Sequence, residues 1–211
     1  MSKILEKKCK EELKNVDFNH KKLLLHSCCA PCSSHVITYL SKYFDITILY
    51  YNPNIAPEEE YLKRKNEQIK LIGMLDTPNK LDFIDCDYDN DKYNELVKGY
   101  ELCPEKGERC TICFNLRIEK TAKIAKDNNY DYFCTTLSVS PYKNAELINK
   151  IGEDMENKYT VKWLHSDFKK DNGYKHSIEL SHKYGLYRQD YCGCVYSKRD
   201  EMLRKSKKGD E

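Results

Sequence analysis

The chain has 211 residues, and Lys+Arg 36 against Asp+Glu 34 leaves a formal net charge of only +2. This length suits one domain with a real hydrophobic core, and the near-neutral balance excludes a uniformly basic nucleic-acid-binding surface. No apolar run is long enough for a membrane span, and the Lys-rich start lacks the apolar core of a signal peptide, so we expect a cytoplasmic protein without a membrane partner.

The spacing of hydrophobic residues predicts strands and helices that alternate along the chain. Residues 1–20 are Lys/Glu-rich and predict an N-terminal helical extension without chemistry. Short apolar or β-rich runs predict five strands, beginning with Leu23–Leu25 before His26 and continuing at residues 46–51, 81–85, 130–136 and 160–164. Helical spacing predicts the intervening helices at residues 33–43, 57–74, 89–97, 110–126, 144–156 and 174–184.

This order predicts an α/β fold with a parallel sheet of about five strands and helices on both faces. Ligands in such folds bind at the carboxyl ends of the strands, where the cysteine-rich turns of this chain fall. We expect residues 1–211 to form a single domain that ends in a basic, mobile tail at residues 197–211.

Eleven cysteines in a reducing compartment indicate metal or redox chemistry and not a disulfide framework. Three of them, Cys28, Cys29 and Cys32, lie at the predicted turn from the first strand into a helix. In a strand that continues, adjacent cysteines point in opposite directions, so Cys28 and Cys29 would serve two neighbouring centres more easily than one zinc ion. The isolated cysteines are interpreted as structural, namely Cys9, Cys86 and Cys134.

Two further cysteine groups follow. Cys110 and Cys113 are three residues apart on one predicted helix face, with Cys103 brought back by the intervening turn, which is strong metal-ligand spacing. Only one glycine separates Cys192 from Cys194, so a disulfide between them would be strained and easily reduced, and the pair could equally ligate a metal. Four cysteines hold one iron–sulfur cluster or one zinc ion, so these groups suffice for two centres.

The motifs H-S-C-C-A-P-C, Y-N-P-N-I with E-Y-L-K-R, C-x6-C-x2-C, T-T-L-x-x-S-P-Y-K and Y-C-G-C occur in this order over roughly residues 23–196. Their joint occurrence resembles the QueH family of epoxyqueuosine reductases and is far more specific than any one motif. The resemblance implies a HUP-like domain that reduces epoxyqueuosine at the wobble position of tRNA to queuosine. It further implies a [4Fe-4S] cluster, an additional mononuclear metal, iron or zinc, and an external electron donor.

The resemblance also implies roles for single residues. The cluster ligands would be Cys28, Cys29, Cys110 and Cys113, and the redox-active pair would be Cys192 and Cys194. Cys32 and Cys103 are the candidates for the second metal. Turn and motif residues that could hold the modified nucleotide are Asn52, Asn54, Arg64, Thr135, Thr136, Ser138, Lys143, Gln189 and Tyr191.

Two other function classes stay open on the residues alone. A thiol–disulfide oxidoreductase would need only C-G-C and would bind no iron. A zinc-dependent nucleic-acid-binding module would bind zinc and have no redox activity. The reductase interpretation accounts for most of the cysteines, because removing an epoxide oxygen takes two electrons and protonation of the departing oxygen, whereas one cluster ordinarily transfers one electron.

Overall fold

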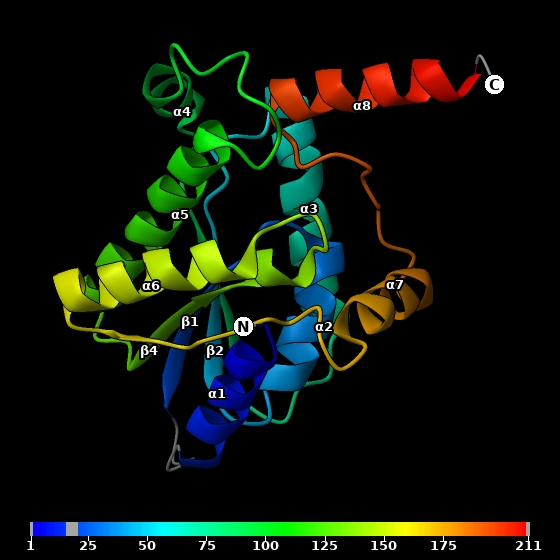
Figure 1. The fold of residues 1–211 in the computed structure, drawn as a ribbon. Coiled ribbons are helices and arrows are strands. Elements are labelled where there is room, and N and C mark those ends of the chain that lie inside the picture. Colours follow the sequence, from blue (N-terminus) through cyan, green and yellow to red (C-terminus); the bar gives the residue numbers. More distant parts are fainter. Residues whose placement is uncertain (1, 16–20, 210–211) are drawn as a thin grey trace.

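A computed structural model describes residues 2–15 and 21–209, and its centre is a parallel sheet (Figure 1). The strands are β1 (Lys22–His26), β2 (Asp45–Tyr50), β3 (Leu81–Asp85), β4 (Tyr132–Thr135) and β5 (Lys162–Trp163), in the order β3-β2-β1-β4-β5. The predicted five-stranded parallel sheet is confirmed. Its order reverses at β1, which pairs with β2 on one side and β4 on the other, and such a switch point is where ligands bind in open α/β sheets.

Helices cover both faces of the sheet, as predicted (Figure 1). They are α1 (Ser2–Asn15), α2 (Ala30–Leu40), α3 (Glu58–Met74), α4 (Asn90–Leu96), α5 (Glu108–Asp127), α6 (Ala145–Tyr159), α7 (Gly173–Lys183) and α8 (Val195–Gly209), with a 3-10 turn η1 (Thr136–Val139) after β4. The largest difference from prediction at a helix start is in α2, which begins three residues earlier because Pro31 fits its first turn.

Strand β1 separates two hydrophobic cores. Leu24 packs with residues of α5 and α6, whereas Leu23 and Leu25 pack with residues of α2 on the other face. All three leucines are fully buried, as expected for a central parallel strand covered by helices on both sides. The cores therefore fix the position of His26, the last residue of β1, and of the turn that follows it.

The two ends of the chain are helical within the described residues. Helix α1 buries Cys9 and Leu13, and Glu12 binds His165, with Oε1 2.6 Å from Nδ1. Helix α8 includes most of the predicted basic tail and extends outward from the domain (Figure 1). The mobility expected of that tail stays a prediction. Within residues 2–15 and 21–209, no helix has the length and apolarity needed to cross a membrane.

Candidate redox and metal site

The turn after β1 brings three sulfur atoms together. The Sγ atoms of Cys28 and Cys29 lie 3.8 Å apart, and those of Cys28, Cys29 and Cys32 all lie within 4.8 Å of one another. The expectation that Cys28 and Cys29 point in opposite directions is wrong. It required a strand that continues, but β1 ends at His26 and Cys29 is already the N-cap of α2. Three converging sulfurs can hold one metal ion.

Contacts among these three thiols shift their pKa values in different directions. Hydrogen bonds from Cys29 and then Cys32, with the nearby cation Lys143, hold the pKa of the Cys28 thiol well below its usual value despite burial. The hydrogen bond to Cys28, with burial, raises the pKa of Cys29 to about 11, and hydrogen bonds to Cys28 and Cys29 raise the pKa of Cys32. Thr136 adds a further hydrogen bond, since its Oγ1 lies 3.3 Å from Cys28 Sγ. Cys28 is therefore the thiolate from which a metal site would be built.

A second sulfur pair lies just before α8. The Sγ atoms of Cys192 and Cys194 are 3.6 Å apart, and Ser197 Oγ lies 3.0 Å from Cys192 Sγ and 3.4 Å from Cys194 Sγ. The hydrogen bond from Cys194, followed by the positive charge of Lys143, holds the pKa of Cys192 well below its usual value. The pKa of Cys194 is raised by the same hydrogen bond. A thiolate beside a thiol at this separation is suited to reversible disulfide formation.

The third sulfur group is the pair Cys110 and Cys113, at the start of α5. Lys106 donates its backbone N–H to Cys110 Sγ at 3.3 Å, and Arg117 Nη1 lies 3.8 Å from Cys113 Sγ. Burial raises the pKa of Cys110 to about 11 and also raises that of Cys113, so both are thiols until a metal replaces the proton.

Two cavities connect these sulfur groups. The larger, about 470 Å³, is lined by Cys28, Cys29, Cys32 and Cys192 among others. The smaller, about 40 Å³, is lined by Cys110, Cys113, Cys192 and Cys194. Cys192 borders both, so seven of the eight candidate cysteines line two neighbouring cavities that share this residue. The eighth, Cys103, borders neither cavity.

Lys143 also borders both cavities. Burial alone would lower the pKa of its amine, but the interaction with the Cys28 thiolate and then with Cys32 outweighs burial and raises the pKa above its usual value. The amine is therefore a cation held against the sulfurs. Positive charge here offsets the charge that several thiolates, or an anionic cluster, would bring to a partly buried site.

Comparison with known proteins identifies the family. A family model described as epoxyqueuosine reductase QueH matches residues 23–200. The chain belongs to the QueH family. A protein of that name from Staphylococcus epidermidis is 45% identical over 185 residues, which cover 86% of this chain and 78% of the relative. Its namesake from Streptococcus pyogenes is 44% identical over 83% of this chain and 69% of its own length, and that from Thermotoga maritima is 36% identical over 83% and 89%.

A buried polar network supports the sulfurs of this QueH chain, and its central residue, Arg117, was not among the predicted site residues. Arg117 donates from Nε to His26 Nε2 at 3.2 Å and from Nη2 to Asn52 Oδ1. Burial and the charge of Arg117 lower the pKa of His26 to about 3, so the ring is neutral. Arg117 follows Cys113 by one helical turn on the same face of α5, which is the sequence signal that could have identified it.

The structure places four of the substrate-binding candidates in internal hydrogen bonds. Asn52 also donates to Ser27 O at 2.9 Å, Thr135 Oγ1 lies 2.7 Å from His26 Nδ1, and Ser138 Oγ lies 3.0 Å from Ser166 Oγ. Together with Thr136 they are buried. Burial supports a role in positioning the cysteine turns and does not support direct contact with a substrate.

The other candidates line the cavities or contact residues that do, although Asn54 and Arg64 are themselves buried. Buried oxygen atoms of Asn54 and Gln189 have no hydrogen-bond partner among the described residues, and each side chain lines one of the cavities. Tyr191 also lines the larger cavity, and its ring packs on the Arg64 guanidinium, 4.9 Å from Cζ to the ring centre. Arg64 itself donates from Nη1 to Cys192 O at 3.2 Å, so it holds the Cys192–Cys194 turn in place.

Replacing Gly193 by alanine should displace the Cys192–Cys194 turn. Gly193 has φ +118, and an added Cβ would lie 2.8 Å from Ile55 Cγ1 and 3.0 Å from Arg64 Nη1. We expect a loss of about 1–3 kcal/mol in the free energy of unfolding by urea, with reduced turnover. Gly99→Ala is the matched control, because Gly99 has φ +88 but nothing within 4 Å of the added atom. Wild-type turnover in Gly193→Ala would show that this turn tolerates displacement.

Proposed function

We propose that this protein reduces epoxyqueuosine at the wobble position of tRNA to queuosine, in the cytoplasm and with an external electron donor. The observation that carries the proposal is that seven cysteines from three distant segments line two cavities that share Cys192, in a chain of the QueH family. The larger cavity, about 470 Å³, has room for a modified nucleobase. A wobble nucleotide lies in a single-stranded loop and can be turned outward at low cost.

The residues of the site can balance the reaction. Removing the epoxide oxygen as water takes two electrons and two protons, and leaves an alkene. Oxidation of the Cys192 thiolate and the Cys194 thiol to a disulfide releases two electrons and one proton, and solvent supplies the second proton. Their sulfurs must close from 3.6 Å to about 2 Å to form that bond. The external donor then reduces the disulfide and restores the dithiol for the next cycle.

We infer that Cys28, Cys29, Cys110 and Cys113 hold a [4Fe-4S] cluster and that Cys32 contributes to a second, mononuclear iron or zinc site. The chemistry of the donor set fits both groups, because thiolates are the usual ligands of each and Lys143 supplies a balancing cation. When bound, the cluster would relay single electrons, and a metal ion with an open position would polarise the epoxide oxygen. Cys103, outside both cavities, is not included.

Anaerobic purification tests the proposal. We expect a brown protein that contains iron and sulfide and converts epoxyqueuosine to queuosine in tRNA isolated from cells that lack the reductase. A colourless protein with stoichiometric zinc and no turnover would instead favour the zinc-dependent nucleic-acid-binding module. A protein that catalyses thiol–disulfide exchange, contains no iron and does not reduce the nucleoside would favour the thiol–disulfide oxidoreductase.

A further inference from the structure

Tyr142 is an exposed aromatic side chain without a partner at the mouth of the site. It lies between η1 and α6, is 58% exposed, and its ring contacts no other ring and no cation among the described residues. Its backbone is fixed, because Tyr142 N donates to Ser140 Oγ at 3.3 Å and Lys143 N donates to Ser140 O at 3.2 Å. Asn144 then caps α6. The ring is therefore presented to solvent from a well-defined turn.

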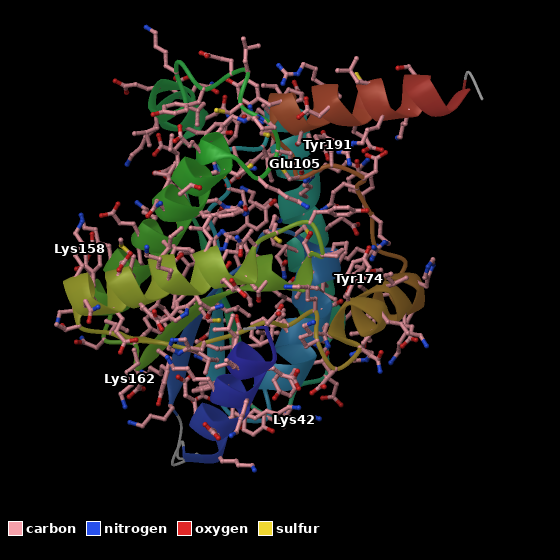
Figure 2. The ribbon with its side chains drawn as sticks, in the orientation of Figure 1. Lys42, Glu105, Lys158, Lys162, Tyr174 and Tyr191 are labelled. Carbon is pink, nitrogen blue, oxygen red and sulfur yellow. The ribbon has the colours of Figure 1, made fainter. Side chains whose placement is uncertain are left out.

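Exposure alone would not assign this ring a role, since single exposed apolar groups are common on protein surfaces. Its position is more specific. Four residues border both cavities, namely Glu105, Tyr142, Lys143 and Cys192, and Tyr142 is the aromatic one. Three other residues that line the larger cavity are labelled in Figure 2, with Glu105 and Tyr191 near the start of α8 and Tyr174 on α7. Tyr142 therefore lies where the two cavities that the cysteines line share their wall.

Charge at this opening does not favour RNA. The ionisable residues other than cysteine and tyrosine that line the larger cavity are three acids and three bases, namely Glu105, Asp190, Glu201, Lys143, Arg188 and Arg204. Arg204 Nη2 lies 3.3 Å from Glu105 Oε2 and 3.2 Å from Glu201 Oε2, so its charge is already paired. Attraction of phosphates is therefore weak here, and binding of an RNA loop has to come from another interaction.

Stacking on an aromatic ring is such an interaction, because every nucleobase has a face that can stack and no net charge is needed. Turning the wobble nucleotide toward the sulfurs removes a stacking partner from the neighbouring base, which stays outside. The ring of Tyr142, 58% exposed at the edge of the larger cavity, is available to stack on that neighbour. We propose that Tyr142 stacks on the nucleobase that flanks the wobble nucleotide and so positions the anticodon loop, an inference that rests on the proposed function.

Kinetics with tRNA that contains epoxyqueuosine test this role. Tyr142→Ala should raise KM about 5- to 150-fold, which corresponds to the loss of one stacked base, and leave kcat and iron content near the wild-type values. Tyr142→Phe keeps the ring and should behave like wild type. Equal losses in both variants would assign the effect to the hydroxyl group, and an unchanged KM in Tyr142→Ala would overturn the proposal.

A fluorescent base gives a direct readout. In anticodon stem–loop RNAs with 2-aminopurine on either side of an epoxyqueuosine nucleotide, saturating wild type and Tyr142→Phe should quench one of the two probes, whereas Tyr142→Ala should not. Quenching that survives in Tyr142→Ala would overturn the stacking role alone, with the reductase activity intact. A wild-type protein that reduces no epoxyqueuosine would overturn the proposed function, and the stacking role with it.

Discussion

Replacing Cys113 by alanine should abolish the visible absorption of the cluster and lower turnover by more than about 100-fold. Loss of a group that supports a metal ligand commonly lowers metal affinity or activity about 10- to 100-fold, and loss of the ligand itself should lower them further. Cys113 is only 8% exposed and its sulfur lies 3.8 Å from Arg117 Nη1, so alanine leaves a buried position without a ligand atom. An absorption spectrum, an iron and sulfide assay and a turnover measurement on one anaerobic preparation check the expectation.

Cys86→Ala is the control for this variant. Cys86 is half-buried and packs against the same core as Cys113, but it borders neither cavity. Its loss should leave iron content and turnover unchanged. If Cys113→Ala protein keeps a complete cluster, the fourth ligand is another cysteine. Cys32 is then the next residue to replace by alanine.

Cys192→Ser should retain the iron–sulfur absorption and lose multiple-turnover reduction, by at least about 1,000-fold, as removal of a reacting nucleophile commonly does. The reason is that a serine hydroxyl cannot form the bond to Cys194, whose Sγ lies 3.6 Å from that of Cys192. Metal analysis separates this role from the alternative one. If Cys192 is instead a ligand of the second metal, the same substitution removes that metal and leaves the cluster.

Two results would contradict both roles. Loss of the whole cluster spectrum would make Cys192 a cluster ligand, and full turnover without metal loss would make the pair dispensable. Cys103→Ser is the matched control, because it replaces a partly exposed thiol that borders neither cavity. Loss of a metal from that control would return Cys103 to the second site.

The strands of the sheet could be predicted because their signal is local. Three leucines in succession predict a strand buried on both faces, and that strand is β1. The start of α2 was missed, since the pattern of apolar residues begins only after Pro31. This difference matters for the site. It places Cys29 at the N-cap and Cys32 in the first turn, and so turns a pair expected to diverge into part of a group of three.

The polar support of the site could not be predicted, because its partners are far apart in the sequence. His26 and Arg117 are 91 residues apart, and His26 and Thr135 are 109 apart. A hydroxyl or amide in a turn looks the same in the sequence whether it faces a substrate or a buried histidine. The side-chain hydrogen bonds that separate these cases depend on the packing of β1 against α5 and β4.

The wide spacing of the sulfurs also sets the order in which the site can be completed. Synthesis from the N-terminus delivers Cys28, Cys29 and Cys32 early, but β4, which flanks β1 opposite β2, comes about a hundred residues later, and Cys192 and Cys194 come last. A nascent chain therefore holds a partial set of thiols that could capture a metal prematurely. The proposed donor set is complete only in the folded chain, so the proposed cofactor would be loaded late, and its binding free energy would add to the stability of the fold.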